Sequence, residues 1–181
     1  MTDKVIKRSV LHKARVFELQ SVDYQDQAGK ITNFSVIAHP GGVVILPVHP
    51  DGSITLVRQW RRVIEKTILE LPAGTLERGE DPLACAKREL AEEGRLAATE
   101  WHALGPIATA PGFCDEILHG FVARGFSEGT GELDDDEELM AERVSRADFE
   151  RMVKSGEIID AKTLALYYRA QSQGLLDEKR S

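Results

Sequence analysis

Residues 74–96 read GTLERGEDPLACAKRELAEEGRL, and more of the fold can be inferred from this stretch than from any other part of the chain. Asp81 is a predicted helix N-cap, and Pro82 suits the first helical position. Apolar residues then recur at the three-to-four spacing of a buried helix face, at Leu83, Ala86 and Leu90. We therefore expect a helix over residues 82–93.

Three carboxylates share one face of this predicted helix. At about 100° per residue, Glu89, Glu92 and Glu93 fall within an arc of about 100°. Like charges at this spacing cost a helix ~0.2–0.5 kcal/mol per pair, so the cluster is unfavourable unless a cation neutralises it. Carboxylate oxygens suit hard cations, which predicts Mg²⁺, with Mn²⁺ as a substitute, rather than zinc. Arg88 is expected to pair with one carboxylate and hold it in its rotamer.

The same stretch resembles the Nudix box, the signature motif of the Nudix hydrolase superfamily. The matching positions are Gly74, Glu80, Arg88, Glu89, Leu90, Glu92 and Glu93. One fixed position differs, because Arg95 stands where the motif has its last glycine, and Gly94 precedes it. Either the helix ends one residue early on Gly94, or Arg95 adopts the left-handed conformation at a cost of about 1–2 kcal/mol.

Further segments resemble the ADP-ribose pyrophosphatase branch of this superfamily. They are HPGGVVILPV (39–48), LVRQWRR (56–62), ELPAG (70–74), APGFCDE (110–116) and GEIIDAKTLALYY (156–168). Pro111 also stands sixteen residues beyond Arg95, where that branch has a proline. The resemblance implies an α/β fold: a Nudix α/β/α sandwich with a mixed sheet, plus a small N-terminal antiparallel β domain. Residues 1–40 would form the N-terminal β hairpin region and help to build a homodimer, and residues 41–181 would form the hydrolase domain.

Local patterns agree with that organisation. Strands over about 16–24 and 31–38 flank DQAGK and predict a hairpin. A second strand pair, about 42–48 and 54–59, flanks the turn signal HPDG. Two later helices are indicated by caps and stops, with Ser145 and Asp160 as N-caps and Gly156 as a stop.

The resemblance implies hydrolysis of ADP-ribose or a related nucleoside diphosphate sugar to a nucleoside monophosphate and a sugar phosphate. Metal would be held by the Ala73 carbonyl, Glu89, Glu92 and Glu93, with Glu93 central to catalysis and Arg88 orienting its neighbours. Members of the family often carry a general base on a later loop, and GELDDDEEL (131–139) occupies that region. Our first choice of base is Glu137, with Asp135 or Glu138 behind it; the alternative is a solvated acidic loop.

Substrate contacts are predicted on three segments. Guanidinium groups suit diphosphate oxygens and an indole can stack on a base, which favours Arg58, Trp60 and Arg61. The alternative is that Trp60 packs in a dimer interface. Glu70 either binds substrate or pairs with an arginine. The segment APGFCDE (110–116) contributes Pro111, Gly112 and Glu116.

Composition restricts the class of protein. The chain has 181 residues, 42% of them hydrophobic, a formal net charge of −7 and two cysteines. The acidic balance argues against nucleic-acid binding, and the lack of a long apolar run or a secretory signal argues against a membrane partner. Two cysteines without framework spacing favour a reduced, cytoplasmic protein. Two alternative functions remain: hydrolysis of another linked diphosphate, such as GDP-mannose, a dinucleoside polyphosphate or coenzyme A, and non-catalytic sensing of ADP-ribose.

Overall fold

The computed structural model describes residues 3–131 and 139–177. The chain divides into two compact units. The first, here called the N-terminal unit, comprises Met1–Gly41 and Ala108–Ile117. The second, the core unit, comprises Gly42–Ile107 and Leu118–Ser181. The loop that carries Pro111 and Glu116 therefore belongs to the N-terminal unit, although it lies far along the chain.

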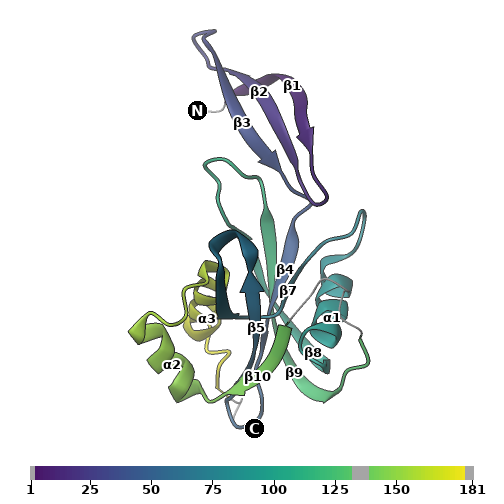
Figure 1. The fold of residues 1–181 in the computed structure, drawn as a ribbon, viewed down its shortest axis with the longest axis vertical. Coiled ribbons are helices and arrows are strands. Elements are labelled where there is room, and N and C mark those ends of the chain that lie inside the picture. Colours follow the sequence, from purple (N-terminus) through teal and green to yellow (C-terminus); the bar gives the residue numbers. More distant parts are fainter. Residues whose placement is uncertain (1–2, 132–138, 178–181) are drawn as a thin grey trace. The chain divides into compact units, whose positions relative to one another are not determined.

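The N-terminal unit contains an antiparallel sheet of three strands in the order β1-β2-β3 (Figure 1). The strands are β1 (Lys4–Lys13), β2 (Glu18–Gln25) and β3 (Ile31–Ala38). The β2–β3 pairing runs without a break from Glu18 opposite Ala38 to Gln25 opposite Ile31. At the turn, the Asp26 carboxylate accepts from the backbone N–H groups of Ala28 and Lys30, both at 2.9 Å. The predicted hairpin is confirmed, and β1 extends it to a small antiparallel β domain.

Two sheets form the centre of the core unit in its described residues, with strand orders β10-β5-β6 and β7-β4-β9-β8. Their strands are β4 (Gly42–Pro47), β5 (Ile54–Arg61), β6 (Lys66–Glu70), β7 (Ala73–Thr75), β8 (Leu96–Ala108), β9 (Ile117–Glu128) and β10 (Leu139–Val144). The helices are η1 (Arg62–Ile64), α1 (Pro82–Glu92), α2 (Arg146–Ser155) and α3 (Ala161–Ser172). β4 pairs parallel with β9 and antiparallel with β7, so the second sheet is mixed.

Strand β4 explains the layering, because every one of its residues is buried. Val43 and Ile45 pack in a cluster with α1, whereas Val44 and Leu46 pack in the larger cluster that includes residues of α2 and α3. Successive side chains of a strand point to opposite faces, so one strand supplies both interfaces. Figure 1 shows α1 on one side of the sheets and α2 with α3 on the other. The predicted α/β/α sandwich is confirmed.

The predicted pairing of the strands around HPDG is wrong, although the turn itself forms. The Gly52 N–H donates to the His49 carbonyl at 2.9 Å, and Gly52 has φ +78°. Only an isolated bridge between Val48 and Ile54 joins the two segments, and β4 and β5 then enter different sheets. Both edges of β4 are occupied by β7 and β9, so β5 pairs with β6 and β10 instead. A turn signal in the sequence thus predicts that the chain reverses direction, but it does not predict which strand the next segment pairs with.

Helix termini follow their local signals. The Asp81 carboxylate accepts from the N–H groups of Leu83 and Ala84, which begins α1 at Pro82. Ser145 and Asp160 cap α2 and α3 in the same way, and Gly156 ends α2 with φ +78°. None of the described helices combines the length and the apolar character that a membrane span requires.

A pH dependence of stability follows from the contact between α2 and α3. The Tyr167 hydroxyl donates to Glu150 at 2.9 Å and Arg146 Nε donates to it at 3.1 Å, and these bonds hold the pKa of Glu150 below its ordinary value. Their contribution to the free energy of unfolding is therefore fully present above the unfolded glutamate pKa of about 4.3 and is lost as the pH falls through the folded value.

We expect Glu150→Gln to flatten the acid side of the stability profile, as measured by urea unfolding between about pH 3 and pH 7. The matched control is Glu157→Gln, because Glu157 is exposed just beyond the end of α2. A Glu150→Gln profile as steep as that of the wild type would contradict the assignment.

Candidate active site

The end of α1 gathers an acidic cluster around one arginine. Arg88 Nη1 donates to Glu89 at 2.7 Å and to Glu92 at 3.0 Å, which confirms the predicted pairing, and Arg88 Nε donates to Glu80 at 3.2 Å. Burial lowers the pKa of Arg88, but its bonds to Glu80 and Glu89 outweigh this and raise it above its ordinary value. The bond to Arg88 in turn lowers the pKa of Glu80. The guanidinium therefore stays charged and orients the carboxylates.

Glu89 lies directly against the backbone of Gly74. Glu89 is only 8% exposed, and a Cβ atom added to Gly74 would lie 1.9 Å from Glu89 Cδ. No side chain fits at residue 74 unless the carboxylate moves. The first glycine of the motif is thus required by the closeness of β7 and α1, and not by an unusual backbone conformation.

Glu93 ties the end of α1 to β7. The residue is 3% exposed, and its Oε2 accepts from the Ala73 N–H at 2.8 Å. The left-handed residue that follows is Arg95, with φ +55°, so the second of the two alternatives for the departure from the motif is the one observed. The Arg95 side chain donates to the Gly131 carbonyl, and the Arg95 carbonyl accepts from the Gly129 N–H at 3.0 Å. These contacts help to offset the strain, and α1 keeps its length up to Glu92.

The donor set suits a hard divalent cation in its chemistry. Glu89, Glu92 and Glu93 supply only oxygen atoms, and two of these residues are buried, where uncompensated negative charge is costly. Within residues 3–131 and 139–177, however, no group of three or more His, Cys, Asp or Glu side chains has the geometry of a metal site. Arg88 supplies the positive charge that the structure places between Glu89 and Glu92.

A second charged cluster joins β5, β6 and α3. Glu70 is fully buried and accepts two bonds from Arg61, Nε to Oε1 at 2.7 Å and Nη2 to Oε2 at 2.8 Å. Lys162 Nζ also donates to Glu70, and it donates to Asp160 at 3.0 Å. Of the two predicted roles of Glu70, pairing with an arginine is the one observed. No role was predicted for Lys162, and its place two residues after the predicted cap Asp160 is the one sequence signal that points to it.

Arg61 and its neighbours on β5 face different ways. Burial lowers the pKa of Arg61, but the bond to Glu70 and the charges of Glu70, Glu93 and Asp160 raise it above its ordinary value. Arg61 therefore shares the electrostatic surroundings of Glu93. Alternation along the strand puts Arg58 and Trp60 on the other face, where Arg58 pairs with Glu142 at 2.9 Å and Trp60 is 45% exposed. Their roles in substrate binding stay predictions.

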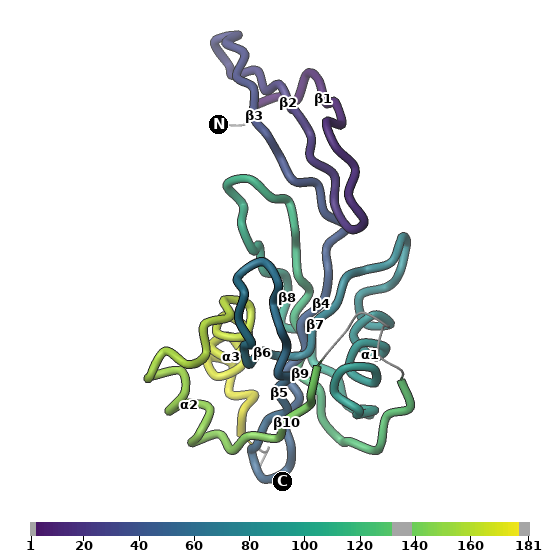
Figure 2. Tube along the Cα trace, viewed as in Figure 1, coloured from purple at the N-terminus to yellow at the C-terminus, as the bar shows by residue number. Residues whose placement is uncertain are grey.

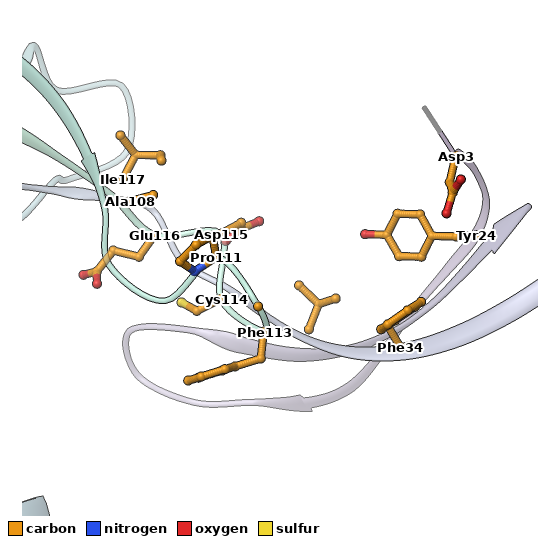
Figure 3. A pocket seen from close by; sticks show the side chains of 12 residues that line it. Asp3, Tyr24, Phe34, Ala108, Pro111, Phe113, Cys114, Asp115, Glu116 and Ile117 are labelled. Carbon is orange, nitrogen blue, oxygen red and sulfur yellow. The ribbon is translucent and has the colours of Figure 1, made fainter. Parts of the chain in front are cut away.

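The remaining predicted substrate residues line a pocket of about 720 Å³ in the N-terminal unit (Figure 3). Its wall includes Tyr24, Phe34, Pro111, Gly112, Phe113 and Glu116. The rings of Tyr24 and Phe34 meet edge to face with centroids 5.6 Å apart. Thr109 Oγ1 donates to Glu116 at 2.6 Å, and His39 Nδ1 lies 3.5 Å from the other oxygen of Glu116. The pocket thus combines aromatic walls with oriented carboxylates, because Asp115 also lines it and its Oδ1 accepts from the His39 N–H at 2.7 Å.

The predicted general base cannot be placed. Asp135, Glu137 and Glu138 lie outside the described residues. Their predicted roles stay predictions.

Cys85 is a poor candidate for a nucleophile. Cys85 is fully buried on α1, beside the acidic cluster around Arg88. Burial together with the charges of Glu89 and Glu80 raises the pKa of its thiol to about 12. This agrees with the packing role of a small buried cysteine.

Comparison with known proteins identifies the class. Residues 38–167 match the family described as NUDIX domain, and the chain belongs to that family. The predicted resemblance to the Nudix hydrolases and the predicted class of enzyme, a pyrophosphohydrolase, are confirmed.

Similar proteins match over nearly the whole chain. An ADP-ribose pyrophosphatase of Bacillus subtilis (strain 168) is 37% identical over 182 residues, covering 99% of this chain and 98% of that protein. A methanol dehydrogenase activator of Bacillus methanolicus is 36% identical over 179 residues, covering 98% and 97%. A solved structure of an ADP compounds hydrolase matches with a TM-score of 0.81 and 20% identity over 97% of both chains, which supports the fold alone.

The contact between Gly74 and Glu89 leads to a prediction. We expect Gly74→Ala to displace the Glu89 carboxylate, to destabilise the protein by about 1–3 kcal/mol and to lower turnover at least about tenfold. In a Glu89→Ala background the added methyl group meets no carboxylate, so Gly74→Ala should cost little further stability. Urea unfolding of the two single variants and the double variant measures this coupling. Equal destabilisation in both backgrounds would contradict the steric explanation.

Proposed function

We propose that this protein catalyses the Mg²⁺-dependent hydrolysis of the pyrophosphate bond of ADP-ribose or a related nucleoside diphosphate sugar. The products are a nucleoside monophosphate and a sugar phosphate. The observation that carries the proposal is the gathering of Glu89, Glu92 and Glu93 at the end of α1, against the Ala73–Gly74 backbone. The relative named ADP-ribose pyrophosphatase supports the choice of substrate.

Glu89, Glu92, Glu93 and the Ala73 carbonyl would hold the cation. When bound, Mg²⁺ neutralises phosphate oxygens and acidifies or orients the attacking water. Arg88 forms ion pairs with Glu89 and Glu92 and restricts their rotamers. Arg61 contributes a permanent positive charge near Glu93, which favours a polyanionic substrate there.

The general base, the substrate contacts and the setting of the enzyme complete the proposal. Glu137 removes a proton from the attacking water, with Asp135 and Glu138 as the alternatives. Pro111, Gly112 and Glu116 contact the substrate. The enzyme acts in the cytoplasm, and its N-terminal β region takes part in a homodimer.

The behaviour of Arg95 favours a hydrolase over a sensor of ADP-ribose. The one feature of the sequence that favours a sensor is the missing last glycine of the motif, where Arg95 stands. Because Arg95 takes the left-handed conformation, Glu93 remains buried and bonded to Ala73. Three clustered carboxylates would serve no evident purpose in a protein that binds ADP-ribose without cleaving it.

The decisive experiment incubates the purified protein with ADP-ribose and Mg²⁺ and follows the release of AMP by chromatography. We expect AMP formation that a chelator abolishes and that Glu93→Gln lowers at least about tenfold, because Glu93 is a proposed metal ligand and the amide replaces its charged carboxylate. Glu157→Gln makes the same chemical change at an exposed position and should retain wild-type turnover.

The outcomes separate the alternatives. ADP-ribose binding without cleavage would favour a sensor, and neither binding nor cleavage would redirect the search to GDP-mannose, dinucleoside polyphosphates and coenzyme A. Wild-type turnover in Glu93→Gln would remove Glu93 from the mechanism.

Assembly is tested independently of activity. We expect light scattering on the purified protein to give about twice the chain mass of 20.1 kDa. A mass near that of one chain would rule out the homodimer.

A further inference from the structure

Two adjacent residues of α3 hold two adjacent residues at the end of β6. Lys162 Nζ donates to the Glu70 carboxylate, and Thr163 Oγ1 accepts from the Leu71 N–H at 2.8 Å. Glu70, Leu71 and Thr163 are all fully buried. Figure 2 shows β6 and α3 side by side, although these partners lie 92 positions apart in the sequence.

One carboxylate orients both of these α3 residues. Asp160 Oδ1 accepts from Lys162 Nζ at 3.0 Å, and Asp160 Oδ2 accepts from Thr163 Oγ1 at 2.6 Å and from the Thr163 N–H at 2.9 Å. The Thr163 hydroxyl donates to Asp160 and accepts from Leu71, so both of its capacities are used in a fixed direction. The helix cap and the anchor of the β6 end are therefore parts of the same hydrogen-bond network.

The other end of this short segment meets the proposed metal ligands. The Pro72 carbonyl accepts from the Ile45 N–H at 2.9 Å, which fastens the segment to β4. The Ala73 N–H donates to Glu93 Oε2 at 2.8 Å. From Glu70 to Ala73, every residue is held at a side-chain or backbone atom. Only Pro72 separates Leu71 from Ala73, so we expect a displacement at Leu71 to be felt at the Ala73 N–H.

We propose that Lys162 and Thr163 are positioning residues that set the place of Ala73 and the rotamer of Glu93 through the Glu70–Ala73 segment. The inference rests on the proposed function, because it assigns these residues to the support of the proposed metal ligands. The hydrogen bonds of Lys162 and Thr163 run to Glu70, Leu71 and Asp160, and the proposed effect on Glu93 passes through the backbone from Glu70 to Ala73.

The chemistry of the network explains why these residue types are needed. Valine in place of Thr163 has nearly the same shape but removes the acceptor of a buried N–H, and an unpaired buried donor forces the backbone to seek another partner. Methionine in place of Lys162 keeps the aliphatic stem but removes one of the two cations beside Glu70, so that Arg61 alone balances that buried charge.

The test compares Thr163→Val with Thr163→Ser in the full-length protein. Mn²⁺ is the probe: its dissociation constant is measured on chelator-treated protein from the electron paramagnetic resonance signal of free Mn²⁺. The values of kcat and KM for ADP-ribose are measured on the same samples. We expect Thr163→Val to weaken Mn²⁺ binding about tenfold and to lower kcat with little change in KM. Thr163→Ser, which keeps the hydroxyl, should stay within about twofold of the wild type.

The matched control is Tyr167→Phe. Tyr167 lies on the same helix and is also buried, and its hydroxyl bonds to Glu150 of α2 rather than to the Glu70–Ala73 segment. Its loss should lower thermal stability while leaving Mn²⁺ binding and kcat at wild-type values. If α3 served stability alone, Thr163→Val would resemble this control.

The outcomes test the positioning role of Lys162 and Thr163 separately from the proposed hydrolysis of ADP-ribose. Wild-type Mn²⁺ affinity in folded Thr163→Val, or no Mn²⁺ binding by the wild type, overturns the positioning role. Weakened Mn²⁺ binding in the variant, with no cleavage of ADP-ribose by the wild type, supports the positioning role and rejects the proposed substrate. If Thr163→Val does not fold, Lys162→Met takes its place and is read in the same way.

Discussion

The close approach of α1 to β7, where the Glu89 carboxylate lies against the backbone of Gly74, is the constraint on which the candidate site depends. This approach is possible because residue 74 has no side chain and because β4 presents Val43 and Ile45 to the apolar face of α1. Packing therefore places a charged group where water is largely excluded. Burying an ionised carboxylate is costly unless opposite charge and hydrogen bonds compensate it, and Arg88 supplies both.

The second charged cluster follows the same physical rule on the other side of the Glu70–Ala73 segment. Glu70 is fully buried and is compensated by Arg61 and Lys162. The two clusters are connected, because the segment that begins at Glu70 ends at the Ala73 N–H that binds Glu93. Buried charge of this kind is weak support for stability, since apolar replacements are often at least as stable. In this protein the buried ion pairs of Glu70 fix geometry. A buried ion pair can adopt few arrangements, so it restricts the positions of the groups bonded to it.

The first residues of α1, α2 and α3 were predicted because the signals for a helix start are local. The caps Asp81, Ser145 and Asp160 bond to N–H groups two or three residues away, and these bonds need no tertiary partner. Strands β1 and β6 to β10 were not predicted individually. Most of β1 is exposed, β7 has only three residues, and β8 carries a mixed pattern of exposure, so none of them shows the clean alternation by which a strand is recognised. The pairing predicted between β4 and β5 failed for a related reason, because strand partners depend on which edges are already occupied.

Local spacing was enough to establish the acidic face of α1, the pairing of Arg88 with a carboxylate and the departure from the family motif at Arg95, since each depends on residues within one or two helical turns. Folding alone assigned Lys162 to Glu70 and Thr163 to the Leu71 N–H. Lys162 and Thr163 lie 92 positions beyond the residues that they bind, and no sequence periodicity connects positions so far apart. Such contacts arise only when α3 packs on the sheet, because burial both brings the groups together and makes an unpaired polar group costly.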